Sequence, residues 1–225
     1  MPGEDCSSGR NRLAGGSTCG AANLGPWNSS IRQLCFTNDV ARTRTLSDQQ
    51  ILHLVAHALN DADNTWTLNE AAAATGLHPA TLIKRFGSRR GLLVALSRRW
   101  VDSIPTAPTT QDPHRELQAW IDSLSIDDTT EAQMLTRLDM LLEDLRDPEL
   151  RALLHHGWQR NISYLTALID HERQDGRMSA GLASETIARL LLDTAHGSLL
   201  RNAVAPDATA ADPSHTARSL LEAMT

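Results

Sequence analysis

From Leu46 onward, the apolar residues of the chain recur every three or four positions, and glycine and proline interrupt the pattern at short intervals. This spacing puts apolar side chains on one face of an α-helix, whereas a half-buried strand needs strict alternation of apolar and polar residues. The sequence contains no alternating stretch of useful length. It therefore predicts an all-α protein, and its 225 residues are enough for helices that bury a sizeable core.

The first two predicted helices share one start signal. Ser47 is followed three residues later by Gln50, and Thr67 in the same way by Glu70. In such a capping box the hydroxyl accepts a free amide of the first turn, while the longer side chain reaches back to the capping residue. Gly76 ends the second helix, because glycine adopts the left-handed conformation that commonly follows a helix.

A third helix is predicted over residues 79–86, because Pro79 suits a first helical turn and Gly87 is a stop signal. Ser88 then caps a fourth helix. Two short helices separated by a tight glycine turn and followed by a basic segment have the spacing of a helix-turn-helix. The expected DNA-binding head is thus a three-helix unit that contains this motif.

Charge is distributed unevenly along the chain. The formal net charge is −6, yet residues 102–225 alone carry ten arginines against twenty acidic residues. Residues 77–101 form a basic run of six cations with no acid: Lys84, Arg85, Arg89, Arg90, Arg98 and Arg99. Such a run on an acidic protein is typical of a small nucleic-acid-contacting module attached to a body that does not bind nucleic acid.

Residues 67–89 read TLNEAAAATGLHPATLIKRFGSR and resemble the TetR/AcrR-type repressors, whose pattern is close to T-[VL]-x-x-[IL]-A-x-x-A-G-[VL]-x-x-x-T-[LI]-Y-x-[YH]-F-x-[SN]-[KR]. Residues 172–178, followed by a long apolar helix, are similar to the family's link between its seventh and eighth helices. Ile83 departs from the pattern, since the family usually carries a tyrosine there whose hydroxyl binds a phosphate. Either Lys84 and Arg85 supply the phosphate contacts instead, or binding is weaker or differently aimed.

Residues 1–44 are rich in Gly, Ser, Asn and Arg and carry no sustained apolar period, so we expect a flexible N-terminal extension, with a DNA-tracking arm or a cysteine redox sensor as the alternatives. The resemblance implies a helix-turn-helix DNA-binding domain over residues 45–101 and a helical ligand-binding and dimerisation domain over 102–225. Helices of this last part are expected near residues 112–125, 129–145, 148–174, 183–204 and 213–224. In the family, the middle helices enclose a small-molecule cavity and the last two pair with the same helices of a second subunit.

Candidate DNA contacts are short polar or cationic side chains on the third helix, and groups at helix N-termini where free amides attract a phosphate. Arg44 is added because it lies directly before the first helix. The candidates are Arg44, Thr67, His78, Ala80, Thr81, Lys84, Arg85 and Arg89. Thr67 and Arg89 have a simpler alternative, which is capping or solvation alone. Arg98 and Arg99 suit the dipole at a helix C-terminus.

Candidate ligand contacts combine large apolar surfaces with a few polar tips, as ligand pockets do. They are Trp120, Met134, Leu138, Leu141, Trp158, Asn161, Tyr164 and Leu165. The apolar stripes that suit a two-fold seam between subunits are Leu190, Leu191, Ala195 and Leu199, with Leu220, Leu221 and Met224 on the last helix. Burial in the chain's own core is the alternative for these seam residues.

Several classes of function lack support in the sequence. His53 and His57 have metal-ligand spacing, but no third ligand is nearby, so no metal is expected. Neither a nucleophile elbow nor a phosphate loop occurs, which argues against an enzyme, and no cofactor is expected. No apolar run reaches membrane-spanning length and no secretory signal precedes Leu24, so we expect a cytoplasmic protein.

The sequence therefore predicts a homodimeric, ligand-responsive transcriptional regulator, a repressor that a small molecule releases from a palindromic DNA operator. The alternative is a helical small-molecule-binding dimer that has lost sequence-specific DNA binding. Ile83 and the acidic body favour that alternative, whereas the basic run argues against it.

Overall fold

The structure, a computed structural model, describes residues 46–62, 66–125, 129–179, 181–204 and 212–224, apart from the side chain of Leu199. Within these ranges the chain forms helices and no strands, which confirms the predicted all-α class. The helices are α1 (Asp48–Asn60), α2 (Leu68–Thr75), α3 (Pro79–Phe86), α4 (Arg89–Ser103), α5 (Pro113–Asp122), α6 (Glu131–Arg146), α7 (Pro148–Gln174), α8 (Ser184–Val204) and α9 (Pro213–Glu222).

Capping residues set the first helix boundaries as the sequence predicts. The Ser47 hydroxyl accepts from the amide of Gln50, whose side chain accepts from the amide of Ser47 at 2.9 Å. Thr67 and Glu70 form the same box at the start of α2. Gly76 follows α2 with a φ of +66°, a conformation that residues with a Cβ avoid.

Two predicted body helices end earlier than expected. α5 ends at Asp122 rather than at residue 125, because the amide of Leu124 turns back to the carbonyl of Ile121 at 3.0 Å. A similar tight turn brings the amide of Met224 to the carbonyl of Leu221 after α9. Tight turns of this kind commonly close a helix, so the apolar pattern continues slightly beyond the helix itself.

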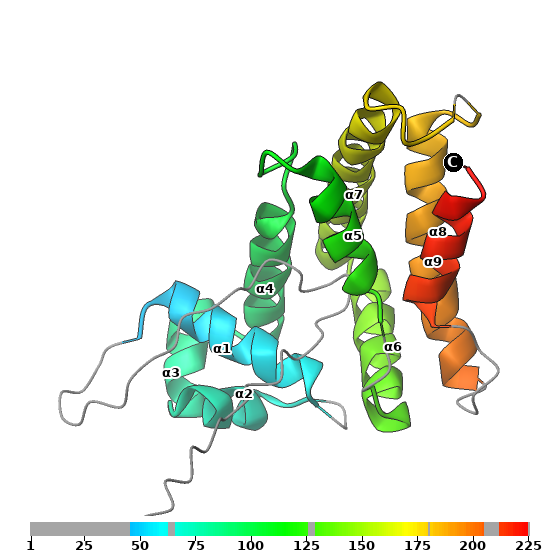
Figure 1. Ribbon diagram of the computed structural model, residues 1–225. Helices are drawn as coiled ribbons and strands as arrows, with labels where there is room; N and C mark the ends of the chain where they lie inside the picture. Colours follow the sequence, from blue (N-terminus) through cyan, green and yellow to red (C-terminus); the bar gives the residue numbers. More distant parts are fainter. Residues whose placement is uncertain (1–45, 63–65, 126–128, 180, 205–211, 225) are drawn as a thin grey trace, which may run out of the picture.

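Helices α1–α4 form a head whose core joins Ile51, Val55, Leu82 and Leu92. Figure 1 shows α1, α2 and α3 grouped around the N-terminal half of α4. Leu150, from the start of α7, is buried in the same cluster. The head is therefore packed directly against the rest of the chain.

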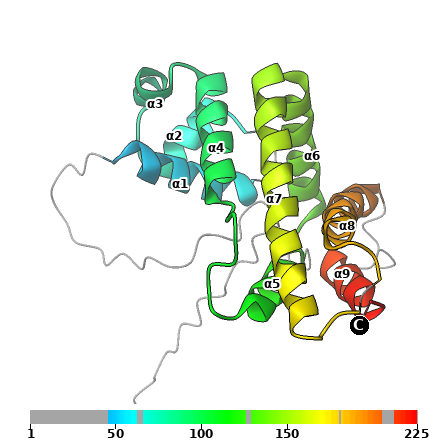
Figure 2. The same ribbon diagram turned by 90° about the horizontal axis from the view of Figure 1, so that it is seen from above.

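Helices α5–α9 form a body around α7, which is 27 residues long. Figure 2 shows α7 between α4 on one side and α6, α8 and α9 on the other. The body core contains Leu117, Trp120, Ile121, Leu165, Leu168, Ile169, Ile187, Leu191, Ala195 and Leu221. None of the helices in the described residues is both long enough and apolar enough to cross a membrane.

The head meets the body where α4 packs along α7. Gly157 of α7 lies under the ring of Trp100, and a Cβ at this glycine would stand 2.0 Å from Trp100 Cζ3. The missing side chain therefore allows the indole to lie against the α7 backbone.

Candidate nucleic-acid interface

Helix α3 presents one exposed face to solvent. Leu82 is fully buried and anchors the helix in the head core, whereas Ala80, Ile83 and Lys84 are exposed. Thr81 is half-buried beside them. A short helix held by one buried leucine, with small and cationic residues facing outward, is the arrangement that a recognition helix requires.

Two of the predicted DNA contacts also cap helices. His78 precedes α3, and its Nδ1 accepts from the amide of Ala80 at 3.3 Å. Thr67 caps α2, and its hydroxyl oxygen accepts from the amide of Glu70 at 3.3 Å. Their phosphate or base contacts remain predictions. Arg44 lies outside the described residues.

Most cations of the basic run are bound within the chain. Arg85 donates to the carbonyl of Leu46 and, at 3.1 Å, to the carboxylate of Asp48. Arg99 donates to Gln49 at 2.8 Å, on the outside of α1. Both guanidinium groups tie α1 to a later helix of the head.

The next two arginines connect the head to the body. Arg89 is bidentate to Glu143, with Nη2 at 2.9 Å from Oε2, and lies over the Trp66 ring at 4.4 Å from its centroid. Arg90 donates from Nε and Nη2 to the two oxygens of Asp147, at 2.6 and 2.9 Å. Two parallel hydrogen bonds of this kind make the strongest class of arginine–carboxylate pair.

A third carboxylate of the body, that of Glu149, also pairs with arginines of α4. Glu149 accepts from Arg90 at 3.0 Å and from Arg98 at 2.8 Å. We call Glu143, Asp147 and Glu149 the corner acids, because they flank the turn between α6 and α7. Among the described residues, Lys84 is the member of the basic run that forms no ion pair or hydrogen bond through its side chain.

The corner acids place three carboxylates around the turn between α6 and α7, each paired with an arginine of α4. The hydrogen bond from Arg90 lowers the pKa of Asp147 to about 2. The same pairing raises the pKa of Arg90. Burial, and then the nearby charges of Glu143 and Asp147, raise the pKa of Asp144 to about 6. One further carboxyl group therefore resists ionisation beside the corner acids.

The predicted ligand residues all lie on α5, α6 and α7, and most are packed in the core. Trp120, Met134, Asn161, Tyr164 and Leu165 are buried, whereas Leu138, Leu141 and Trp158 are half-buried. Trp158 packs against His196 of α8 with ring centroids 4.9 Å apart. The indole nitrogens of Trp120 and Trp158 are buried without a hydrogen-bond partner.

The polar groups of Tyr164 and Asn161 already have hydrogen-bond partners within the chain. The Tyr164 hydroxyl donates to Glu116 at 2.5 Å, and Glu116 also accepts from the amide of Thr109 at 2.9 Å. Although burial opposes its ionisation, these hydrogen bonds lower the pKa of Glu116 to about 2. Asn161 donates to the carbonyl of Gly157 at 3.3 Å. Both side chains therefore hold the structure of the body.

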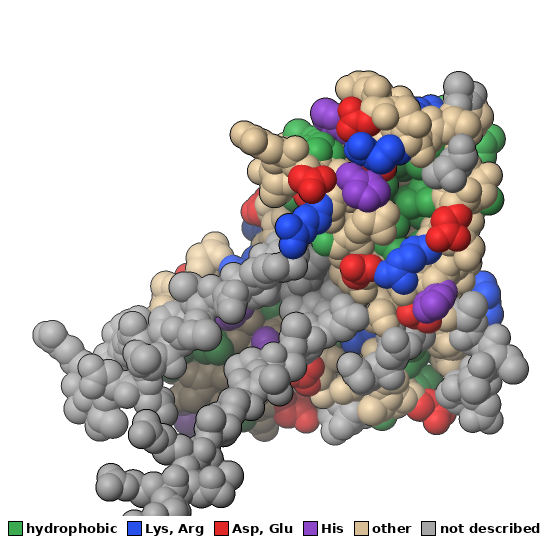
Figure 3. All heavy atoms as spheres, in the orientation of Figure 1, with side chains coloured by type: hydrophobic (Ala, Val, Ile, Leu, Met, Phe, Trp, Pro, Cys, Tyr) green, Lys and Arg blue, Asp and Glu red, His purple; other side chains and the backbone are tan. Residues whose placement is uncertain are grey.

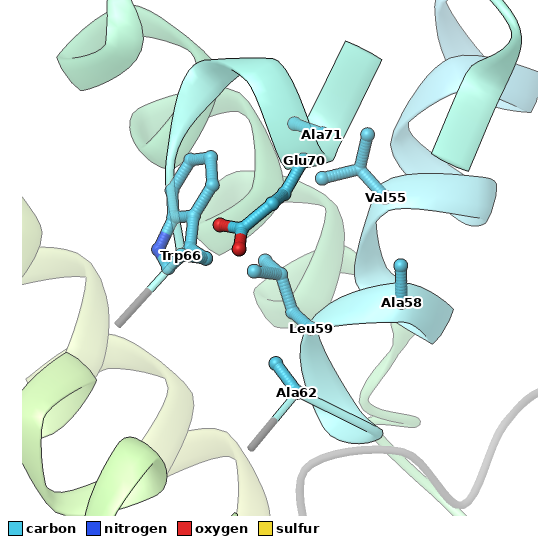
Figure 4. Close-up of a pocket in the computed structure, with 7 residues that line it drawn as sticks. All are labelled: Val55, Ala58, Leu59, Ala62, Trp66, Glu70 and Ala71. Carbon is cyan, nitrogen blue, oxygen red and sulfur yellow. The ribbon is translucent and has the colours of Figure 1, made fainter. Parts of the chain in front are cut away.

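A shallow pocket of about 290 Å³ opens in the head between α1 and α2. Figure 4 shows the Glu70 carboxylate between Trp66 and Leu59 at its centre. Trp66 is 2% exposed and was not among the residues predicted from sequence. Its position between two helices leaves no periodic signal, although a lone tryptophan beside a capping threonine could have marked it as a packing residue.

Three residues of the predicted subunit seam follow the alternative of burial within the chain. Leu191, Ala195 and Leu221 are buried in the chain's own core, because α8 and α9 pack against each other and against the rest of the body. Leu220 and Met224 are half-buried against the same core. Leu190 is 37% exposed, and the side chain of Leu199 is not described. The apolar side chains that α8 leaves exposed are Leu190, Leu200 and Val204.

The chain is similar in structure to solved transcription regulators. A TetR transcription regulator from Haloarcula marismortui matches with a TM-score of 0.59 and 22% identity, covering 78% of this chain and 96% of that one. The chain has the TetR-type fold. A transcriptional regulator from a Rhodococcus species matches this fold with a TM-score of 0.56 and 18% identity, over 77% and 95% of the two chains.

GusR from Salmonella enterica shares the TetR-type fold with a TM-score of 0.54 and 19% identity, over 80% of this chain and 98% of that one. No family model and no curated protein match the chain. The Haloarcula and Rhodococcus structures are both named as transcription regulators. Within the described residues, no group of three or more His, Cys, Asp or Glu side chains could hold a metal ion.

Proposed function

We propose that the chain is a DNA-binding transcriptional regulator whose α3 enters the major groove. The observation that carries this proposal is the exposed face of α3, where Lys84 stands unpaired beside Ala80 on a helix anchored by Leu82. The TetR-type fold supports the same function. Thr81, His78 and the groups at the starts of α2 and α4 complete the proposed contacts.

The proposal extends to a homodimer that represses transcription and is released from its operator by a small molecule. Residues 45–101 serve as the DNA-binding domain and residues 102–225 as the ligand-binding and dimerisation domain. The exposed side chains of Leu200 and Val204 support a subunit contact on α8, since Val204 is 86% exposed. The buried, unpartnered indole nitrogens of Trp120 and Trp158 favour a ligand that carries hydrogen-bond acceptors.

A second candidate function is a helical ligand-binding dimer that no longer reads DNA. The pairing of Arg89 and Arg90 with body carboxylates favours it, because a neutralised guanidinium attracts phosphate less strongly. Ile83, 47% exposed on α3, favours it as well, since it offers no hydroxyl to a phosphate.

The substitution Lys84→Ala separates the two functions. Full-length protein is titrated into a fluorescent duplex selected from a random pool, at several salt concentrations. If α3 contacts phosphates, Lys84→Ala weakens binding and reduces the log–log salt slope by about 1 per protomer. Arg115→Ala is the matched control, because Arg115 is an exposed cation on α5 in the body.

The control should bind like the wild type. Equal affinity and equal salt slope for wild type and Lys84→Ala would contradict the assignment of α3. If the full-length chain selects no duplex from the pool, the proposed DNA-binding function is wrong.

A further inference from the structure

The corner acids bind two head arginines in the way that DNA phosphates would. Arg89 uses Nη1 and Nη2 on Glu143, and Arg90 uses Nε and Nη2 on Asp147. A guanidinium group recognises carboxylate and phosphate with the same planar pair of N–H donors. Each guanidinium can therefore present this pair of donors to only one of the two anions at a time.

Both arginines lie where phosphate contacts are expected. They are the first two residues of α4, directly after the turn that follows α3. Free backbone amides at a helix N-terminus attract phosphate, and two cations there would add to that attraction. In the structure this attraction is directed instead to carboxylates of the body.

The acids belong to the part of the chain that is proposed to bind the ligand. Glu143 lies near the C-terminus of α6, Asp147 caps α7, and Glu149 lies in the first turn of α7. The carboxyl of Asp144, half-buried beside them, adds to the negative potential whenever it is ionised. A shift of the turn between α6 and α7 would thus move several carboxylates away from the head together.

The ion pairs of Glu143 and Asp147 are partly buried and are held by further contacts. Glu143 and Arg89 are each about one third exposed, and the guanidinium is also held against Trp66. The Asp147 side chain is 20% exposed and also accepts from the amides of Glu149 and Leu150. Carboxylates held in place in this way are ready acceptors, whereas a DNA phosphate must displace them to reach the arginines.

We propose that the corner acids compete with DNA phosphates for Arg89 and Arg90, so that the chain restrains its own DNA-binding head. This competition rests on the proposed function. Release of the two arginines from Glu143 and Asp147 adds phosphate contacts, and rebinding to the corner acids removes them. A movement of the α6–α7 turn therefore alters DNA affinity through phosphate contacts, with no change in the base-reading face of α3.

The test neutralises the corner without changing its shape. The double variant Glu143→Gln/Asp147→Asn keeps both side chains nearly isosteric, and asparagine remains a good N-cap for α7. The matched control is Asp122→Asn/Glu185→Gln, which also removes two carboxylates, each paired with an arginine, from the body. Circular dichroism and thermal unfolding check that all proteins are folded.

Binding is measured by fluorescence anisotropy on a mixed-sequence 30-bp duplex, because phosphate contacts do not depend on the operator sequence. We expect the corner variant to bind about tenfold more tightly per released arginine near 0.1 M salt. Its salt slope should be steeper by about 1 per protomer for Arg89 and by up to about 2 in all, since Glu149 still accepts from Arg90. Adding Arg89→Gln and Arg90→Gln to the corner variant should return the slope to that of the wild type.

Three results would overturn the competition. The corner variant and the wild type could have the same slope, the control could gain as much as the corner variant, or the gain could survive the loss of both arginines. Each of these leaves the proposed function standing if the wild type binds DNA. If none of the proteins binds any duplex, the DNA-binding function is wrong and the competition is refuted with it.

Discussion

The contact between Gly157 and Trp100 makes an unusual stability prediction. Glycine inside an exposed helix normally costs about 1 kcal/mol relative to alanine, so Gly157→Ala would ordinarily stabilise α7. Here the new Cβ would stand 2.0 Å from Cζ3 and 2.1 Å from Cη2 of Trp100. The indole must move away, and overpacking of this kind costs about 1–3 kcal/mol.

The expected net effect of Gly157→Ala is a free energy of unfolding lower by about 0–2 kcal/mol, after the gain in helix propensity is subtracted. Urea unfolding followed by circular dichroism measures it. Gly197→Ala on α8 is the matched control, since no atom within 4 Å would meet its Cβ. That control should be neutral or stabilising by up to about 1 kcal/mol.

A double-mutant cycle identifies the cause. In a Trp100→Ala background the obstacle is gone, so Gly157→Ala should become stabilising by about 0.5–1 kcal/mol. The reasoning is refuted if Gly157→Ala stabilises the wild type as Gly197→Ala does. It is also refuted if the loss persists unchanged without the indole.

Two further predictions concern titratable groups of the body. The folded-state pKa of Asp144, about 6, lies above its usual value, so the folded chain binds this proton more tightly than the unfolded chain does and stability falls as pH rises from about 4 to 6. Asp144→Asn should remove this loss and raise the free energy of unfolding at pH 7 by about 1 kcal/mol, allowing for partial exposure. Urea unfolding at pH 4 and pH 7 measures this change in stability. An equal change at both pH values would contradict the prediction. Tyr164→Phe should lower the free energy of unfolding by about 1–2 kcal/mol, because it removes the hydroxyl that donates to the ionised Glu116. An unchanged urea midpoint for Tyr164→Phe would show that this hydrogen bond contributes nothing net.

The helices could be predicted because their signals are local. A capping box spans three residues, as at Ser47 and Gln50, and a stop such as Gly76 acts on the turn just before it. The whole of α7 was predicted at its observed bounds, because Pro148 begins it and a glycine follows its end. Where the prediction ran long, at α5 and α9, the apolar pattern continued into a closing turn.

The side-chain partners could not be predicted in the same way. Arg90 and Asp147 are 57 residues apart in sequence, and Arg89 and Glu143 are 54 apart. No local pattern links a cation on one helix to a carboxylate on another, because the pairing depends on how α4 and α6 each pack against α7. The same limit explains why Trp66 was missed and why Leu191 was placed on a subunit seam.

This limit changes how the basic run is interpreted. A count of cations measures formal charge, whereas DNA responds to the potential that remains after internal pairing. On the face of the body shown in Figure 3, acidic and basic side chains also lie next to one another, so formal charge and free charge differ there too. If the corner acids release their arginines only when the α6–α7 turn moves, the number of phosphates that the head contacts depends on the state of the body. The salt slope of DNA binding is then a direct measure of that state, because each released guanidinium adds about one counterion to the slope.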